Sequence, residues 1–144
     1  MPDNLTPSQR SFCMSRVRSR DTSLERRIRS ELHLRGLRFR KYDRKLPGTP
    51  DVVFASARVA VFIDGDFWHG FHFSKWKHTL SDSWAEKIQT NIARDKKAWS
   101  GLKKMGWCVV RIWEHEIKQD VLSCVCRIEA AVNDRRSQHA RNRM

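Results

Sequence analysis

The run from Arg58 to Ile63 restricts the possible folds more than any other stretch of the sequence. After its arginine it reads Val-Ala-Val-Phe-Ile, which is apolar throughout and rich in β-branched residues. A strand with water on one face alternates apolar with polar residues, whereas a strand without that alternation is buried on both faces. We therefore predict a central strand here, in a sheet covered on both sides, within a chain of 144 residues that fits one domain.

Capping signals and periodicity predict the other elements. Their order is helices, strands, helix, strand and helix, which predicts an α/β fold with a central mixed β-sheet flanked by α-helices. The expected elements are a short basic helix from Thr6 to about Val17, a helix from the capping box Thr22–Glu25 to Gly36, strands over 37–42, 51–54 and 107–113, a helix marked from Trp84 to Gly106, and a helix over 121–132.

The net charge of +13 calls for an acidic partner. Lys and Arg displace counterions from phosphates, so double-stranded DNA is the expected partner. A membrane surface is the rival, but we find neither a basic amphipathic helix with a broad apolar face nor an apolar run long enough to span a bilayer. The first residues also lack the pattern of a secretion signal. We expect a cytoplasmic protein that does not bind membranes.

Two carboxylates are placed where a DNA-binding protein would gain from having none. Asp51 opens one predicted strand and Asp64 closes the next. If these strands form a hairpin, both carboxylates meet at one edge of the sheet, where a divalent cation would relieve their repulsion. Mg²⁺ suits such oxygen ligands, and Mn²⁺ is a possible substitute. The alternative is that both are ordinary turn residues, beside Pro50 and Gly65 respectively.

Three further residues are candidates for acid–base chemistry. His69 lies shortly after Asp64 and titrates near neutral pH, although a surface histidine is an equally good interpretation. Glu25 is explained by its capping box, and an added catalytic role is compatible with that. Asp95 lies between Arg94 and Lys96, where a solvated helix face would account for it.

Read together, these residues resemble the very-short-patch-repair (Vsr) DNA mismatch endonuclease family. The likeness runs from about residue 6 to residue 132, and the ordered set of matches is more specific than any one of them. The matching pieces are Met14, Arg20-Asp21-Thr22 with Glu25, Leu46-Pro47-Gly48-Thr49-Pro50-Asp51, Phe67-Trp68-His69, Trp84-Ala85-Glu86-Lys87-Ile88, Asn91, Arg94-Asp95, Gly106-Trp107 and Trp113-Glu114.

The resemblance implies a restriction-endonuclease-like fold and Mg²⁺-dependent nicking of one strand beside a T·G mismatch, the product of 5-methylcytosine deamination. It implies that Asp51 and the carbonyl of Ile63 hold the metal, to which the carboxylate pair described above adds Asp64. His69 would act as base or proton shuttle, Asp95 would orient it, and Glu25 would hold a water of the metal. The DNA-binding residues it implies are Met14, Phe67, Trp68 and Trp84, which would wedge into the base stack, together with Lys87 and Asn91. Core packing is the alternative for Trp84, because it lies at helical spacing from Ile88.

Two departures from the family separate this chain from familiar members. The positions of a structural zinc site, normally Cys and His, are Asp66, Phe71, Phe73 and His115, so we predict no structural zinc. A replacement site of His72, His78 and His115 stays open, as does hydrophobic packing of the loop by its phenylalanines. Asp64 also stands where familiar members have His, which leaves the route of proton transfer open.

Three functions compete. The first is a mismatch-directed nicking enzyme of repair, acting as a monomer on nucleoid DNA with possible partners among repair proteins. The second is a nicking nuclease of a defence or mobile-element system without mismatch specificity. The third is a non-catalytic DNA-binding module, which the acidic residues oppose. For any of them we expect a single domain over residues 1–134, with a basic N-terminal helix within 1–20 contacting DNA, and a basic flexible tail over 135–144.

Overall fold

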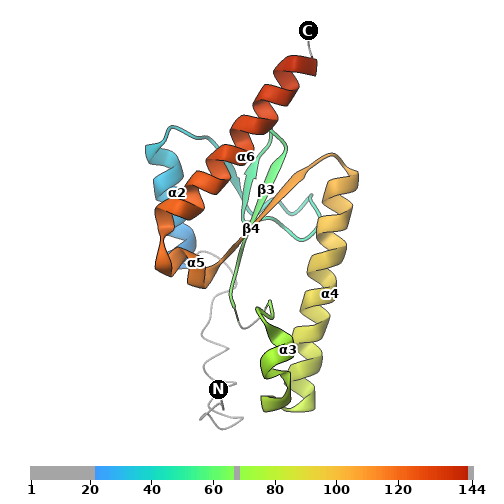
Figure 1. Cartoon of the computed structure of the whole chain (residues 1–144). Coiled ribbons are helices and arrows are strands. Elements are labelled where there is room, and N and C mark those ends of the chain that lie inside the picture. The colour runs from blue at the N-terminus through green and yellow to red at the C-terminus, as the bar shows by residue number, and fades with distance from the viewer. Residues whose placement is uncertain (1–21, 67–68, 143–144) are drawn as a thin grey trace.

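A four-stranded mixed sheet forms the centre of the molecule (Figure 1). The computed structural model describes residues 22–66 and 69–142. The strands lie in the order β1-β2-β3-β4; β1–β2 and β2–β3 are antiparallel and β3–β4 is parallel. Their bounds are β1 Arg40–Lys41, β2 Val52–Phe54, β3 Val59–Asp64 and β4 Cys108–Trp113. The predicted α/β class with a mixed sheet is confirmed.

Helices cover both faces of this sheet, as Figure 1 shows. Three helices pack on one face, and one long helix packs on the other beside a short helical segment. Among the described residues no helix is long and apolar enough to cross a membrane. The first face carries α2 Ser23–Leu34, α5 Glu114–Gln119 and α6 Val121–Asn142, and the second carries α4 Asp82–Lys104, preceded by α3 Phe73–Trp76 and the 3₁₀ turn η1 Lys77–Thr79.

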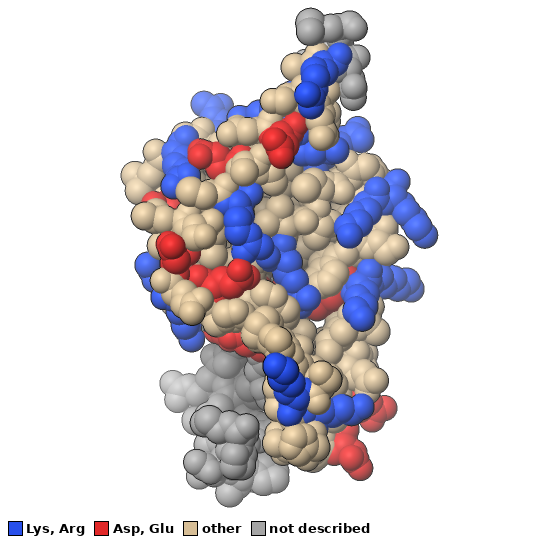
Figure 2. Space-filling model, in the orientation of Figure 1, with Lys and Arg blue, Asp and Glu red and all other residues tan. Residues whose placement is uncertain are grey.

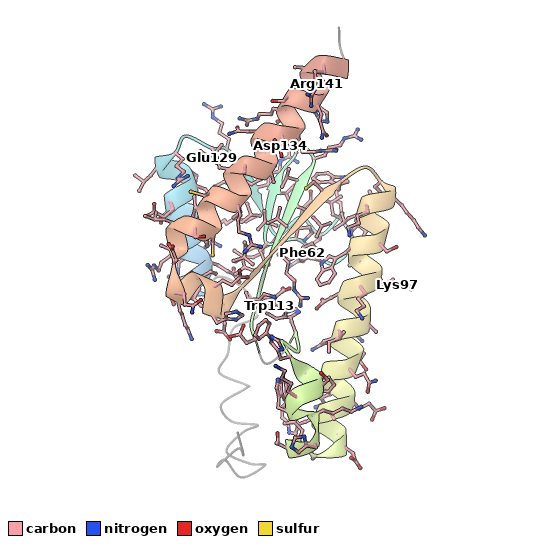
Figure 3. The ribbon with its side chains drawn as sticks, in the orientation of Figure 1. Phe62, Lys97, Trp113, Glu129, Asp134 and Arg141 are labelled. Carbon is pink, nitrogen blue, oxygen red and sulfur yellow. The ribbon has the colours of Figure 1, made fainter. Side chains whose placement is uncertain are left out.

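Strand β3 is buried on both faces, as its unbroken apolar run predicts. Val59 and Val61 pack into the core under α2 and α6, whereas Ala60 and Phe62 pack into the core under α4 (Figure 3). Alternate residues of a strand point to opposite faces, so one apolar run serves both cores. The last residue of this strand, Asp64, points to the α4 side by the same alternation, which places the site described below.

The helix N-cap at Thr22 and the β2–β3 hairpin are found where the sequence predicts them. The Thr22 hydroxyl accepts a hydrogen bond from the Glu25 N–H at 3.2 Å, and Val52 pairs with Val61 across the hairpin. The strand expected over 37–42 is wrong in extent, because only Arg40 and Lys41 pair with β2. The N-terminal helix expected from Thr6, like the whole segment 1–20, lies outside the described residues.

The C-terminal part of the chain differs most from expectation. Helix α5 was not predicted, and helix α6 continues to Asn142 instead of ending at Val132. Most of the segment expected as a flexible tail, 135–144, is therefore helical. Arg135 explains part of this extension, because its guanidinium donates to the carbonyls of Ala57 and Gly106 in two turns of the sheet edge.

The turn from Pro47 to Pro50 fits tightly between the sheet and α4. Gly48 has φ +76°, and a Cβ placed there would lie 2.8 Å from the Ala98 Cβ and 3.1 Å from the Phe62 ring. Gly36 has the same φ of +76°, but a Cβ there would meet nothing within 4 Å. The two glycines thus share the left-handed backbone that disfavours side chains, and only Gly48 also lacks space.

We predict that Gly48→Ala destabilises the fold more than its matched control, Gly36→Ala. The control should cost about 1 kcal/mol for the left-handed backbone alone. Gly48→Ala should cost about 1–3 kcal/mol more, because the overlap with Ala98 and Phe62 must be relieved. Chemical denaturation of both variants measures the difference, and equal losses would show that the turn is not packed against α4 as described.

Candidate active site at the end of the central strands

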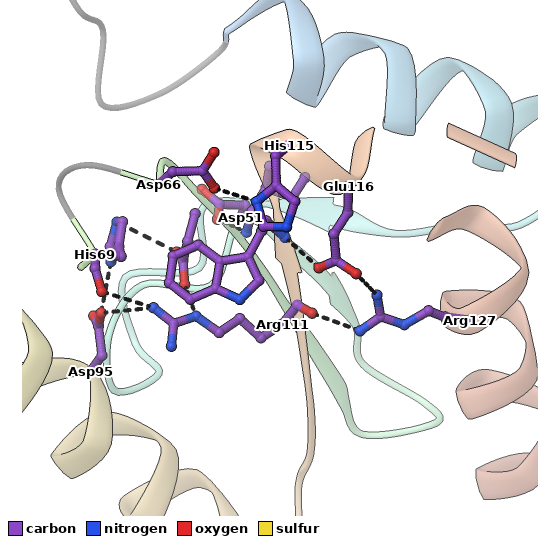
Figure 4. A network of polar contacts seen from close by, with 11 residues as sticks. Asp51, Asp66, His69, Asp95, Arg111, His115, Glu116 and Arg127 are labelled. Atoms are coloured by element: carbon purple, nitrogen blue, oxygen red, sulfur yellow. Dashed lines mark hydrogen bonds and ion pairs between the residues drawn. The ribbon is translucent and has the colours of Figure 1, made fainter. Parts of the chain in front are cut away.

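The hairpin brings two acidic residues to one end of the sheet (Figure 4). Asp51 directly precedes β2, and Asp64 is the last residue of β3. The Asp51 N–H donates to the Val61 carbonyl at 2.9 Å, and the Asp51 Oδ2 accepts from the Ile63 N–H at 2.7 Å. Asp51 is therefore fixed to β3 by its backbone and by its side chain. Both carboxylates therefore lie at the same end of the sheet, although the group of converging ligand atoms contains Asp64, His69 and Asp95 and not Asp51.

Asp51 retains an unusually basic carboxylate. Burial raises the pKa of Asp51 from 3.8 to about 7; the Ile63 N–H lowers it, and the charges of Glu25 and Asp64 raise it. Among the described residues no Lys or Arg forms an ion pair with it. A partly buried carboxylate with acidic neighbours and one backbone donor is the kind of group that a cation stabilises.

Asp64 already has a cationic partner, which the sequence analysis missed. The Arg111 Nε donates to the Asp64 Oδ2 at 2.6 Å, and the Asp64 side chain is only 4% exposed. Burial raises the pKa of Asp64, while the charges of His69 and Arg111 oppose that rise. The expectation that a divalent ion alone would let the two carboxylates coexist is thus incomplete. The signal for Arg111 was present as a lone charge inside the apolar run of β4.

His69 lies between two carboxylates. Its Nδ1 is 2.7 Å from the Asp95 Oδ2, and its Nε2 is 3.5 Å from the Asp64 Oδ1. Burial lowers the pKa of His69, but the hydrogen bond to Asp95 and the charge of Asp64 outweigh burial and raise it overall. Neither a surface histidine nor a merely solvated Asp95 describes this pair. An imidazole held by a carboxylate at one nitrogen can move a proton at the other.

Glu25 faces the sheet and not the solvent. It is 2% exposed, and its carboxylate accepts a hydrogen bond from the Tyr42 hydroxyl at 2.6 Å. The Arg29 guanidinium lies 3.5 Å from the same oxygen. Because Glu25 also raises the pKa of Asp51, its charge reaches the site. The backbone N–H of Glu25 therefore takes part in the helix cap at Thr22, while its carboxylate adds negative charge near Asp51.

Three of the four positions expected of a zinc site connect the loop to α5 through an ion pair and ring contacts. The Asp66 carboxylate pairs with His115 Nδ1 at 2.8 Å, and the Asp66 N–H donates to Glu114 at 3.0 Å. The Phe71 ring lies 4.3 Å from the His115 ring and 5.0 Å from the Trp113 ring, measured between centroids. The loop is thus attached to the start of α5 at two of its residues, Asp66 and Phe71.

Metal-ligand atoms converge at one place in the described part of the chain. Asp64, His69 and Asp95 offer ligand atoms within 4.8 Å of one another. The alternative grouping of His72, His78 and His115 does not converge in this way among the described residues. Phe73, at another position where familiar members of the family have a zinc ligand, packs its ring with its centroid 5.2 Å from that of the Trp76 ring.

The expected DNA-binding residues fall into two groups. Met14, Phe67 and Trp68 lie outside the described residues. Trp84, Lys87 and Asn91 lie on α4 at helical spacing from Asp95. They therefore share one face of the helix with Asp95, and this stripe extends along it from the Asp95–His69 pair toward the start of α4. The Lys87 ammonium lies 4.9 Å above the ring of Trp84, which is half-buried. Both core packing and surface contact thus describe Trp84 in part.

A basic surface accompanies this stripe. Figure 2 shows Lys and Arg side chains on the α4 side as well as over the rest of the visible face, with acidic side chains at the lower end of α4. On α4 a hollow of about 540 Å³ contains Lys87 and Asn91. Positive charge beside a hollow is the footprint expected for a phosphate backbone. The hollow is lined by Ser83, Glu86, Lys87, Thr90, Asn91 and Arg94.

Comparison with known proteins places this arrangement in a family. Residues 2–75 match the family described as DNA mismatch endonuclease Vsr. The chain is 41% identical to the Type II nicking enzyme V.XorIIP of Xanthomonas oryzae over 119 residues, covering 81% of this chain and 88% of that protein. It is 36% identical to the Type II nicking enzyme V.NmeDIP of Neisseria meningitidis over 136 residues, covering 92% of each.

A relative named for mismatches is similarly close. The chain is 40% identical to the DNA mismatch endonuclease Vsr of Escherichia coli over 116 residues, covering 79% of this chain and 74% of that protein. These relatives are named as nicking enzymes or as a DNA endonuclease, which supports an enzyme that hydrolyses DNA over a passive binding module. By its fold, its site and these likenesses, the chain belongs to the Vsr family of DNA endonucleases.

Proposed function

We propose that this endonuclease nicks one strand of duplex DNA at T·G mismatches and requires Mg²⁺. The observation that carries the proposal is His69 held between Asp95 and Asp64, beside the uncompensated carboxylate of Asp51. Hydrolysis of a phosphodiester needs a proton acceptor for water and a cation for the phosphate. This end of the sheet offers a residue suited to each task.

The residues present fit a hard divalent cation near Asp51. Its Oδ2 is occupied by the Ile63 N–H, which leaves Oδ1 for a ligand. Asp64 can add its Oδ1, because Arg111 occupies its Oδ2. With the Ile63 carbonyl these make an all-oxygen set, the chemistry that Mg²⁺ prefers and Mn²⁺ accepts. The ion, when bound, supplies charge to polarise the phosphate and to acidify water.

The side chains around the metal divide the remaining work. Asp95 fixes the His69 ring through Nδ1, which directs Nε2 toward Asp64 and leaves it as the nitrogen that takes a proton. Glu25, held by the Tyr42 hydroxyl, would order a water next to Asp51. The stripe of Lys87 and Asn91 would position the backbone of the DNA.

Mismatch selection is the property that separates the two candidate functions, nicking directed by a mismatch and nicking without mismatch specificity. Phe67 and Trp68 stand in sequence between Asp66 and His69, and aromatic rings there would replace base stacking when a weak pair opens. The Xanthomonas and Neisseria relatives are named as nicking enzymes without mention of a mismatch, which favours a second candidate, a nicking nuclease of a defence or mobile-element system without mismatch specificity. For either candidate we propose a cytoplasmic monomer acting on nucleoid DNA, with repair proteins as possible partners for the first.

The proposal predicts nicking of one strand at T·G in duplexes that differ only at one base pair. We expect the T·G duplex to be nicked at least tenfold faster than matched duplex, because a mismatch costs less to open. Replacing Phe67 and Trp68 with Ala should remove this preference while salt-sensitive binding persists. Equal nicking of matched and mismatched duplexes of several sequences would favour the second candidate.

Asp51→Asn should abolish nicking, retain DNA binding and stabilise the metal-free protein. The folded-state pKa of Asp51, about 7, exceeds the value of 3.8 in the unfolded chain. The folded state therefore holds the proton more tightly, and its stability falls as pH rises from about 4 to about 7. Asparagine removes this cost, so we expect a gain on the order of 2 kcal/mol at pH 8 and none near pH 4.

Denaturation in EDTA at both pH values measures that gain. The matched control is Asp134→Asn, which removes the same charge from an exposed position on α6. The control should neither stabilise the protein nor impair nicking. An Asp51→Asn protein that nicks normally would remove Asp51 from the reaction, and full activity of the parent in excess EDTA would remove the metal.

We predict that the purified protein contains no stoichiometric zinc. The Asp66–His115 pair and the Phe71 ring already occupy the positions that zinc ligands take in familiar family members. Neither Phe71 nor Phe73 can ligate a metal, and the loop contains no cysteine that could take their place. Elemental analysis checks this, and one tightly held zinc per chain would contradict it.

A further inference from the structure

Arg111 contacts three segments of the chain that meet at the active site (Figure 4). Its Nε donates to Asp64 on β3 at 2.6 Å, and its Nη2 lies 3.6 Å from the Asp95 carboxylate on α4. The same Nη2 donates to the backbone carbonyl of His69 in the loop at 3.4 Å. One guanidinium thus joins both carboxylates that flank the His69 ring to the backbone of His69 itself.

Two tryptophans hold the guanidinium in place. Its central carbon lies 3.8 Å from the ring centroid of Trp113 and 4.4 Å from that of Trp99. Trp99 in turn meets Phe62 edge-on, with centroids 6.2 Å apart. A planar cation between aromatic faces is favourable on both sides, so the group has little freedom to rotate.

The backbone of Arg111 is fixed as well. It pairs in register with Phe62 in the parallel β3–β4 ladder. Its carbonyl accepts a hydrogen bond at 2.9 Å from Arg127, which also pairs with Glu116 at 2.6 Å. Arg111 is therefore rigid from its backbone to its guanidinium, whereas the loop that carries His69 has little regular structure of its own.

Charge gives this rigid group its importance. Asp64 and Asp95 flank the His69 ring and repel each other, and Asp51 adds a negative charge that interacts with Asp64. Arginine keeps its charge at every working pH and presents several donors in a fixed plane, so it can hold both carboxylates at once. Lysine offers one point charge and cannot reproduce that geometry.

We propose that Arg111 is a positioning residue that fixes Asp64 and Asp95, and through them the orientation of the His69 imidazole, for phosphodiester hydrolysis. This inference rests on the proton-transfer role proposed for His69. Arg111 does not touch the reacting atoms in this account; its effect passes through the carboxylates. Its loss should therefore slow the chemical step without weakening DNA binding beyond the loss of one charge.

The test compares Arg111→Met and Arg111→Lys with the matched control Arg35→Met. The control removes the same charge from a partly exposed ion pair with Glu129, and Arg35, at the end of α2, contacts neither Asp64, Asp95 nor His69 in the structure. Two quantities are measured for each protein. One is the single-turnover nicking rate at saturating DNA, and the other is the NMR signal of the hydrogen-bonded His69 ring N–H without metal, assigned with His69→Ala.

We expect Arg111→Met to lower the single-turnover rate on the order of 100-fold, as misplacement of a catalytic group does, and to lose the His69 N–H signal. Arg111→Lys should fall between Arg111→Met and the parent, and Arg35→Met should keep the rate and the signal. DNA affinity should be equal in Arg111→Met and Arg35→Met.

An Arg111→Met protein that nicks within about twofold of Arg35→Met and keeps the His69 signal would overturn the inference. If thermal unfolding shows that the Met variant is not folded, Arg111→Lys decides: a parental rate with a parental signal overturns the inference. His69→Ala separates the two levels of the account. A parental rate in His69→Ala refutes the proton-transfer role, whereas an inactive His69→Ala beside an active Arg111→Met refutes only the inference about Arg111.

Discussion

The pairing of β3 with both of its neighbours is the constraint on which the site depends. Strand β3 runs antiparallel to β2 and parallel to β4, so Asp51 before β2, Asp64 at the end of β3 and Trp113 at the end of β4 share one sheet edge. A slip of one residue in β3 would turn Asp64 away from α4 and Phe62 out of its core. The burial of β3 on both faces therefore fixes the chemistry as well as the fold.

Burial at this edge opposes stability. Desolvation raises the pKa of both Asp51 and Asp64, so keeping these carboxylates charged costs free energy in the folded protein. The two are relieved differently. Asp64 has Arg111, a cation built into the sheet, while Asp51 has one backbone donor and acidic neighbours. Because Asp51 lacks a built-in cation, we assign the exchangeable metal ion to Asp51. A buried carboxylate that lowers stability but can bind the metal is an example of stability given up for activity.

The sequence predicted what depends on local pattern, and it missed what depends on distant contacts. The central strand, the hairpin and the cap at Thr22 follow from neighbouring residues, and the structure contains all three. Arg111 meets Asp64 across 47 positions of sequence, a contact that exists only because β3 and β4 are parallel. Asp95 likewise looked solvated between two basic residues until the loop brought His69 to it. The extension of α6 rests on Arg135 reaching two distant turns.

The position of a bound Mn²⁺ ion tests the central claim most directly. Anomalous diffraction from crystals of the protein with uncleaved DNA and Mn²⁺ would locate the ion without reference to activity. We predict a peak in contact with the Asp51 carboxylate, with Arg111 still paired to Asp64 and His69 still paired to Asp95. A peak held by Asp64, His69 and Asp95 with Arg111 displaced, and away from Asp51, would contradict it.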